Sequence, residues 1–384
     1  MKDADFGVKS RFFYIVSCLL GMIITYYIRD TTYSQISNYK GCKKLFDLPW
    51  FFTLVMTIAM SSCMIVYLIL VKINPMHGPK FKNIQMQMYF IPIIPSVCDL
   101  FASMFYSFSL VNNKGKISTA LRYFELFSIV IMRTLLFESI NYSFRWFSLG
   151  IIFLGIFFVV FSVISDENKE GSVKAFPIIL QIISQILYAT KSIFEEKILH
   201  NNDLSPWWLM GVEGVYGFFI NLFIVYPIVY VIPLNKNTKG IHENFCESIY
   251  MAFHSKAVIA LIFIYIPFSC LYNGSIGGTI QTTNSINYTI VEMIASSLAW
   301  IVDLIIYYGF KGKYIIPCYN EDFKSITKGI QWTKLSWMRL IGSIIFLFGE
   351  LTYIGIIKFS FFRYPDSNVK IITLNEVLIK DHDT

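Results

Sequence analysis

Long apolar stretches alternate with short polar segments along almost the whole chain. Each apolar stretch holds about 20 residues, the length at which a helix crosses a hydrocarbon core about 30 Å thick. Polar and apolar residues do not alternate strictly within them, as they would in barrel strands, and only helices and closed barrels satisfy their backbone groups in lipid. The pattern therefore predicts an all-α, polytopic membrane protein with ten transmembrane helices. Their approximate bounds are residues 12–28, 50–71, 88–110, 117–137, 146–165, 175–195, 207–232, 257–279, 286–308 and 335–357.

The composition agrees with this pattern and excludes several classes of protein. Hydrophobic residues make up 55% of the chain and charged residues 15%, against roughly 25% charged residues in soluble domains. The net charge of +7 is spread over many loops, which is typical of membrane-flanking positions rather than of a nucleic-acid surface. The first apolar run lacks a small-x-small cleavage site, so we expect it to remain as the first helix. No nucleic-acid partner is predicted.

The histidines and cysteines form no recognisable metal or cofactor motif. None of the five histidines lies within a predicted span, and the sequence contains no Cys-x-x-Cys pair. A membrane-embedded enzyme would need paired acids, a histidine cluster or a nucleophile with its base at membrane depth. We therefore predict no enzymatic activity, no metal site and no cofactor.

The last span of each set of five begins in the same way. A tryptophan is followed by glycines one to three turns later: Trp146, Gly150 and Gly155 in the fifth span, and Trp337, Gly342 and Gly349 in the tenth. An interfacial tryptophan with close-packing glycines is common in membrane helices, but its return after five spans favours an internal repeat. Two halves separated by an odd number of crossings have opposite orientations. The chain is thus predicted to hold two inverted five-helix repeats, residues 1–165 and 175–360, followed by a polar tail, residues 361–384.

Charged and polar side chains form two columns within the spans. They are Arg122, Glu125 and Arg133 in span four, and Glu292, Ser296 and Asp303 in span nine. In a continuous helix, two residues eleven apart lie within about 20° of the same face. Each charge at mid-span costs about 2.5–3.5 kcal/mol on insertion scales, so exposure of both columns to lipid is not expected. Three interpretations stay open: the columns line a cavity, they neutralise each other as structural ion pairs, or some of their charged groups reach the membrane interface.

Further polar residues lie in spans three and six and at the start of span seven. Asp99, Gln185 and Lys191 are candidates for the same cavity; the alternatives are a satisfied polar residue in the bundle and a lysine that reaches the interface. The junction of spans six and seven is interpreted either as solvated helix ends with close-packing glycines or as a hinge between the halves. In the hinge, a carboxylate would bind the first amides of span seven, around residues 211–214. The hinge candidates are Glu195, Glu196, Lys197, Gly211, Glu213, Gly214 and Gly217.

The same junction carries a family resemblance. Glu195 follows Gln185 by ten residues, and the glycine-rich motif of span seven follows Pro206. This pattern resembles the drug/metabolite transporter superfamily and, within it, the nucleotide-sugar-transporter-like proteins of solute carrier family 35, subfamily F. The long loop between spans seven and eight, with an amphipathic segment at residues 241–256, is also similar to the chloroquine-resistance-transporter branch. Weaker matches lie at Cys98-Asp99, Leu121-Arg122 and Tyr272-Asn273.

The resemblance covers roughly residues 49–357 and implies that spans four and nine line a solute path. The chain departs from the family at Tyr123, where the family has glycine, and at Lys191, where it has glutamine. These departures leave the substrate open.

The leading prediction is a secondary transporter that moves a nucleotide, nucleotide sugar or similar metabolite across an internal membrane by alternating access. Such exchange would use Arg122 and Arg133 as anion contacts. One alternative is a proton-coupled exporter of amino acids, peptides or basic drugs, in which Glu292, Asp303 or Asp99 would carry the proton. Another is a receptor or scaffold of the same fold. The expected partners are the lipid bilayer and a small solute, with a counter-solute or a proton; the membrane is of the lysosomal, vacuolar or Golgi type, with the plasma membrane as an alternative.

Overall fold

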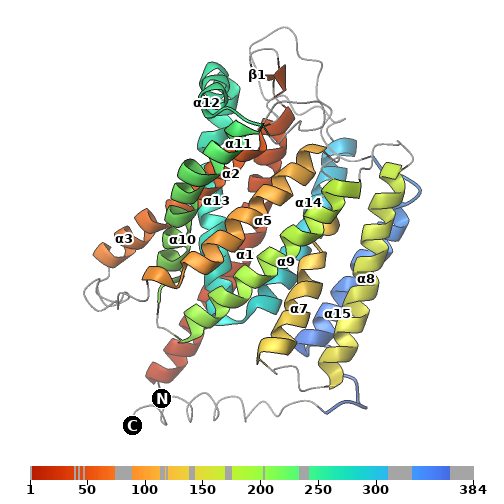
Figure 1. Ribbon diagram of the computed structural model, residues 1–384. Helices are drawn as coiled ribbons and strands as arrows, with labels where there is room; N and C mark the ends of the chain where they lie inside the picture. The colour runs from red at the N-terminus through yellow and green to blue at the C-terminus, as the bar shows by residue number, and fades with distance from the viewer. Residues whose placement is uncertain are drawn as a thin grey trace.

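The computed structural model is built almost wholly from helices that cross the molecule at moderate angles (Figure 1). It describes residues 2–38, 40–41, 44–45, 48–73, 89–112, 117, 120–137, 143–168, 175–201, 204–232, 242–309 and 331–363. Two short strands, β1 (Lys40–Gly41) and β2 (Lys44–Leu45), pair antiparallel after the first helix. The helices are α1 (Lys2–Asn38), α2 (Pro49–Ser61), α3 (Cys63–Ile73), α5 (Ile93–Asn112), α7 (Phe124–Phe137), α8 (Ser143–Asn168), α9 (Ala175–Asn201), α10 (Pro206–Ile220), the π-helical η3 (Asn221–Val225), α11 (Tyr226–Val231), α12 (Phe245–His254), α13 (Lys256–Thr282), α14 (Ser285–Gly309) and α15 (Ser336–Ile354).

The chain is a helical, multi-pass membrane protein. Within the described residues, eight helical segments are long and apolar enough to cross a membrane. They coincide with eight of the ten predicted spans, and a further predicted span, 12–28, lies within α1. The remaining span, 117–137, is only partly met, because α7 begins at Phe124 after a turn at Arg122 and Tyr123. The arrangement as ten helices in two inverted repeats stays a prediction.

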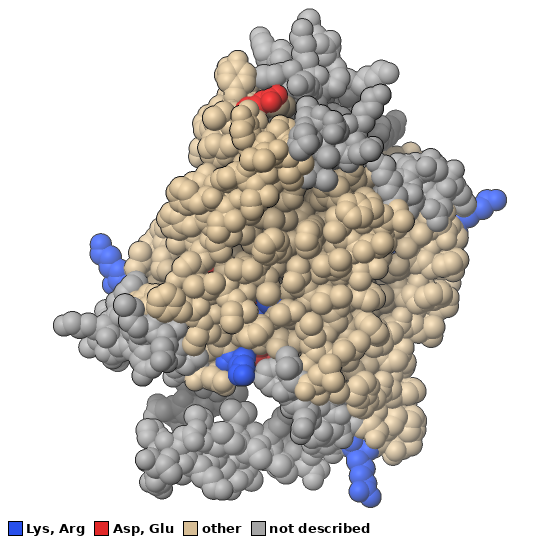
Figure 2. All heavy atoms as spheres, viewed as in Figure 1, with Lys and Arg blue, Asp and Glu red and all other residues tan. Residues whose placement is uncertain are grey.

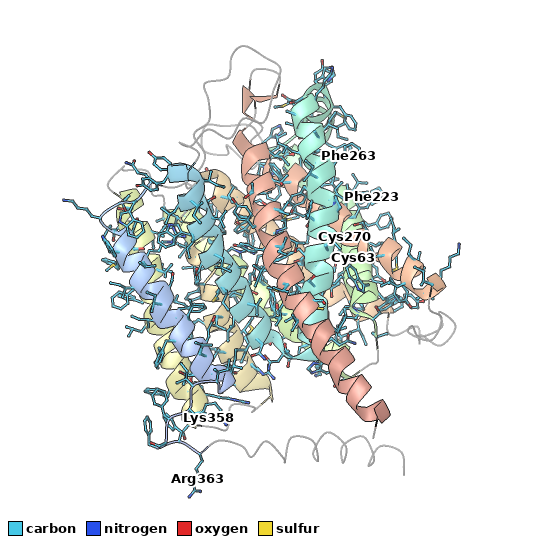
Figure 3. All side chains as sticks on the ribbon, turned by 180° about the vertical axis from the view of Figure 1, so that it is seen from behind. Cys63, Phe223, Phe263, Cys270, Lys358 and Arg363 are labelled. Carbon is cyan, nitrogen blue, oxygen red and sulfur yellow. The ribbon has the colours of Figure 1, made fainter. Side chains whose placement is uncertain are left out.

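The outer surface is apolar, as a lipid-facing surface must be. Figure 2 shows a face whose described side chains are mostly uncharged, with the few lysine, arginine and acidic side chains mostly towards its edges. Phe223 and Phe263 point outward from α10–α11 and α13 (Figure 3), and their exposed fractions are 67% and 71%. Large apolar patches of this kind mark contact with a partner or a membrane.

Several helices are interrupted, and the interruptions have local causes. A turn at Ser62 separates α2 from α3. The π-helical turn η3 precedes Pro227, which has no N–H to donate to the carbonyl four residues earlier. Pro267 lies inside α13. The predicted amphipathic segment after span seven becomes α12, which begins at an Asn244 cap whose side chain accepts a hydrogen bond from the backbone N–H of Cys246.

Glycines set the closest helix contacts. A Cβ atom on Gly155 would lie 2.6 Å from the backbone nitrogen of Phe346, and one on Gly342 would lie 2.8 Å from the carbonyl oxygen of Gly155. A Cβ atom on Gly211 would lie 2.6 Å from the backbone nitrogen of Met64. These approaches confirm close packing of α8 on α15 and of α10 on α2–α3. Gly150, in contrast, has no heavy atom within 4 Å of its Cβ position.

Three pairs of helices make the most extensive contacts: α8 with α15, α5 with α9, and α1 with α13. The first pair stands side by side at one edge of the molecule (Figure 1) and runs antiparallel. The hydroxyl of Thr333, just before α15, donates to Asp166 Oδ2 near the end of α8 at 2.6 Å. At the opposite end, the ring of Phe147 lies 5.7 Å from that of Phe359, centroid to centroid.

Glu243 holds the start of α2 from a distant part of the sequence. Its carboxylate accepts hydrogen bonds from the backbone N–H groups of Trp50 and Phe51, at 3.0 Å each, and from the hydroxyls of Tyr226 and Ser248 at 3.1 and 2.8 Å. These bonds satisfy two N–H groups that have no partner within the helix. Burial raises the pKa of Glu243 from 4.5 to about 7, against the hydrogen bonds, which lower it. Because the folded pKa is the higher one, the contribution of Glu243 to stability is full below about pH 4.5 and is lost as the pH rises through about 7.

Candidate functional site

A cavity with charged walls lies at the centre of the bundle. Its volume is about 50 Å³, which is room for a few water molecules. Side chains from α1, α2, α5, α7, α9, α13 and α14, together with Arg122, line it. Its charged members are Arg29, Asp99, Arg122, Glu125, Lys191, Glu195 and Glu292.

An ion pair between Arg122 and Glu292 forms one wall. Arg122 Nη2 lies 2.5 Å from Glu292 Oε1, although the two residues are 170 positions apart in the sequence. The hydroxyl of Tyr272 donates to Oε1 at 2.6 Å, and the hydroxyl of Tyr288 donates to Oε2 at 3.0 Å. The guanidinium also lies 5.4 Å from the centre of the Tyr26 ring. Each carboxylate oxygen of Glu292 therefore has at least one donor, and the pair satisfies the conditions for a buried ion pair.

Glu125 lies beside this pair. Its carboxylate is buried and accepts a hydrogen bond from the Tyr288 hydroxyl at 3.3 Å. A second, smaller cavity of about 10 Å³ adjoins the first and is lined by Arg122, Glu125, Glu292 and Ser296, among others. The structure thus brings Ser296 to the site predicted from its place on the ninth span.

Arg29 is a cation of the cavity that sequence reasoning missed. The first predicted span ended at residue 28, but α1 continues to Asn38 and carries Arg29 inward. Its guanidinium carbon lies 4.0 Å from the centre of the Tyr272 ring, a close cation–π contact. Among the described residues, no carboxylate forms an ion pair with it. Hydropathy did not indicate this position, because the apolar run ends before Arg29 while the helix continues to Asn38.

The opposite wall is acidic and is built from α5 and α9. Lys191 Nζ lies 2.7 Å from Asp99 Oδ1 and 3.5 Å from Glu195 Oε1. The hydroxyls of Tyr188 and Ser103 contact each other at 2.9 Å along the same wall. Lys191 is buried, so the sequence alternative in which it reaches the membrane interface does not hold.

Arg133 lies outside both cavities. Its Nη2 pairs with Glu196 Oε1 at 3.0 Å, and Glu196 Oε2 accepts hydrogen bonds from the backbone N–H and the hydroxyl of Ser285 at 2.9 and 2.6 Å. The helix that Glu196 caps is therefore α14, where we expected a carboxylate to bind the helix start around residues 211–214. Arg122 and Arg133 do not share a face because the chain turns at Arg122 and Tyr123, so the spacing of a continuous helix does not apply.

The remaining predicted residues lie away from the cavity wall. Gln185 is buried without lining either cavity, and Asp303 lies beyond Glu292 on α14, where its charge acts on Arg339. Lys197 is exposed at the end of α9. Gly211, Gly214 and Gly217 face α2, α3 and Ser96 at close range, and Glu213 is buried between them.

Comparisons with known proteins agree with a solute-carrier resemblance. The chain is 24% identical to an uncharacterized protein of Schizosaccharomyces pombe over 267 residues, which cover 69% of this chain and 74% of that protein. It is 20% identical to rat solute carrier family 35 member F6 over 278 residues, covering 70% of this chain and 66% of the rat protein. It is 24% identical to the mouse protein of that name over 173 residues, covering 41% of this chain and 44% of the mouse protein. No protein-family model matches.

The chain thus resembles distant relatives of the solute carrier 35 type and spans less than two thirds of the mouse protein. The similarity to the chloroquine-resistance-transporter branch stays a prediction.

Proposed function

We propose that this protein is a secondary transporter that moves an organic solute across an internal membrane by alternating access through the central cavity. The observation that carries the proposal is the cavity itself, which is lined by seven helices, holds seven charged side chains and lies inside a bundle with apolar outer faces. Charges at membrane depth are costly and usually mark a solute or ion path. The similarity to solute carriers supports the same conclusion.

The pattern of helix contacts supports two inverted halves around this cavity. In the predicted repeat, α1 corresponds to α9, α2–α3 to α10–α11, α5 to α13, α7 to α14 and α8 to α15. If each helix is replaced by its counterpart in the other half, the α5–α9 contact becomes α13–α1. In the same way, α7–α9 becomes α14–α1, and α10–α13 becomes α2–α5. All six of these pairs are in contact in the structure. The α8–α15 pair maps onto itself and is antiparallel, as an inverted repeat requires.

The charges of the cavity support one solute class. Arg122 is neutralised by Glu292, whereas Arg29 forms no ion pair within the described residues and its guanidinium lies against the Tyr272 ring. A guanidinium binds phosphate and carboxylate groups through paired hydrogen bonds. Tyrosine rings at positions 106, 188, 272 and 288 line the same cavity and offer faces to a planar ring. The chemistry of the lining therefore favours a nucleotide, nucleotide sugar or similar anionic metabolite, for which the cavity must widen during the transport cycle.

Arg29 also weighs against a non-transporting receptor of the same fold. A cavity that serves only structure would have its charges neutralised internally, because an unpaired buried charge destabilises a protein strongly. A proton-coupled exporter is favoured by a different observation, the acidic wall around Asp99 and Glu195. Transport of an anionic solute would depend on Arg29, whereas proton-coupled export would depend on the acidic wall.

Uptake into proteoliposomes tests the proposal. Purified protein would be reconstituted and given labelled nucleotides, nucleotide sugars, amino acids and basic drugs, one class at a time. Arg29→Gln should lower saturable uptake of the anionic class about tenfold or more, since a hydrogen bond to a charged group contributes about 1.5–3 kcal/mol. Arg363→Gln is the matched control, because Arg363 is exposed beyond the end of α15 (Figure 3).

Arg29 is preferred to Arg122 as the test residue because Arg122→Ala would leave the buried Glu292 carboxylate without its cation. Uptake that is unchanged in Arg29→Gln but lost in Asp99→Asn would favour the proton-coupled exporter of basic solutes. Absence of uptake of every class by monodisperse protein would contradict transport and favour the receptor.

A further inference from the structure

A pair of carboxyl groups lies behind the acidic wall of the cavity, where α9 packs near α10. Glu195 and Glu213 are 0% and 1% exposed, and their carboxyl groups lie within hydrogen-bonding range of each other. None of their four carboxyl oxygens accepts a hydrogen bond from a donor in the described part of the chain. Two buried carboxylates with no donor between them repel each other strongly, so one proton must be shared for the arrangement to persist.

The helix packing leaves little freedom for this pair to separate. Gly211 and Gly214 flank Glu213 and bring α10 into backbone contact with α2 and α3. The hydroxyl of Ser96 donates to the backbone carbonyl of Glu213 at 2.8 Å, which joins α10 to α5. The position of the Glu213 carboxyl group is therefore fixed from two sides.

The charges around the pair do not neutralise it. Lys191 is the cation in contact, 3.5 Å from Glu195 Oε1, but it is engaged more closely by Asp99 at 2.7 Å. The carboxyl groups of Asp99, Glu195 and Glu213 thus share the positive charge of one ammonium group, that of Lys191. The other titratable groups on this side include the thiols of Cys63 and Cys270, 3.6 Å apart at the centre of the molecule (Figure 3), the Cys98 thiol, the Tyr188 hydroxyl and the carboxyl group of Glu125. None of them supplies a positive charge.

We propose that Glu195 and Glu213 bind one shared proton and that this pair is the proton-coupling site of the transporter. The coupling role rests on the function proposed above, whereas the shared proton does not. The sequence placed these residues in a hinge and assigned proton coupling to Asp99, Glu292 or Asp303.

The geometry assigns the proton to Glu213 and its acceptor to Glu195. Lys191 stabilises the ionised form of Glu195, while no cation contacts Glu213 in the described residues. Glu195 lines the cavity and Glu213 does not. The proton therefore passes from the Glu213 carboxyl to a Glu195 oxygen and from there to water in the cavity. No other bond is made or broken.

Loss of the proton changes the cavity wall through Lys191. With both carboxylates ionised, the pair carries two negative charges and attracts the ammonium group of Lys191 away from Asp99. The Asp99 carboxylate is then free to accept a hydrogen bond from a donor or cationic group of the solute. Protonation of the pair returns Lys191 to Asp99. Binding of the proton by Glu195 and Glu213 therefore competes with binding of the solute group by Asp99.

Infrared difference spectroscopy of the purified protein tests the shared proton without any solute. The wild type at neutral pH should show a carbonyl band of a protonated carboxyl group that disappears in Glu213→Gln. In Glu195→Gln the buried Glu213 carboxyl keeps its proton but loses its carboxylate partner, so the band should shift instead of disappearing. Both variants keep the side-chain shape: in Glu213→Gln the new amide can donate to the Glu195 carboxylate, and in Glu195→Gln the new amide oxygen can accept from the Glu213 carboxyl group. Glu350→Gln is the matched control: Glu350 is a buried carboxyl group on α15 with an oxygen that has no donor, outside the cavity wall. It should remove a different band.

Transport tests the coupling role in proteoliposomes, with the solute class that the wild type takes up. Accumulation driven by a pH gradient should be lost in Glu213→Gln, while exchange of labelled for unlabelled solute at equal pH continues. Glu350→Gln should retain both activities.

The outcomes separate this proposal from the proposed function. A carbonyl band that survives in Glu213→Gln, or one lost there but left unshifted in Glu195→Gln, overturns the shared proton. Gradient-driven accumulation that survives in Glu213→Gln overturns the coupling role. If the wild type moves no solute at all, transport and coupling fall together, and the infrared band still decides whether the pair holds a proton.

Discussion

Replacing Gly214 with alanine adds one methyl group at the contact between α10 and the α2–α3 turn. The new Cβ atom would overlap the backbone nitrogen of Ser61 and lie 2.5 Å from the carbonyl carbon of Met60, where ordinary contact begins at 3.4 Å. Both neighbours are backbone atoms, so no side-chain rotation relieves the overlap. The helices must separate, and the nearby contact of Gly211 with Met64 loosens with them.

The expected loss can be estimated from two opposing effects. Overpacking of a well-packed interior costs about 1–3 kcal/mol, and a contact between backbones belongs at the upper end of that range. Alanine favours a helix over glycine by about 1 kcal/mol. We therefore expect Gly214→Ala to lower the free energy of unfolding by about 2 kcal/mol.

Unfolding in mixed micelles, followed by helical circular dichroism, measures this change. The matched control is Gly150→Ala, at an exposed helical position with no heavy atom within 4 Å of the new Cβ atom. It should raise the stability by up to about 1 kcal/mol through helix propensity alone. Equal stability of the two variants would show that α10 does not rest on α2 and α3 as described, and would remove the support for a fixed Glu213.

Three further predictions concern the two buried carboxylates that cap helices. Glu243→Gln should flatten the stability profile between about pH 4.5 and 7, where the wild type loses about 3 kcal/mol as Glu243 ionises; an unchanged slope in unfolding titrations would contradict this. Ser285→Ala should cost about 1–2 kcal/mol by removing a hydroxyl from the Glu196 cap of α14. A double-mutant cycle of Arg133→Ala with Glu196→Gln should give a coupling of at least about 0.5 kcal/mol, and strict additivity would refute the ion pair.

Much of the fold could be predicted because the constraint of a bilayer acts locally. A run of about 20 apolar residues must form a helix wherever it lies in the chain, since no other structure satisfies its backbone in lipid. Close helix packing at Gly155, Gly211 and Gly342 was equally readable, because only a residue without a side chain permits such an approach. Nothing about these features depends on the position of a distant segment.

The candidate site was predicted in part, for a related reason. Charges at membrane depth stand out in an apolar sequence, and Arg122, Lys191 and Glu292 do line the cavity. Arg133 does not, because a break in the helix cancelled the spacing on which the prediction relied. Arg29 was missed because hydropathy marks where an apolar run ends, while the helix continued beyond it to Asn38.

The sequence by itself determined that this chain crosses a membrane many times, where its helices pack closely, and that several charges lie within its spans. Only the tertiary structure decided which of those charges meet. Arg122 pairs with Glu292 across 170 positions, and Glu195 faces Glu213 while Glu196, its neighbour in the sequence, caps α14. Hydropathy is a property of each segment, but a pairing depends on how whole helices are placed and rotated against each other. That placement follows from packing over the entire bundle, which a linear pattern does not contain.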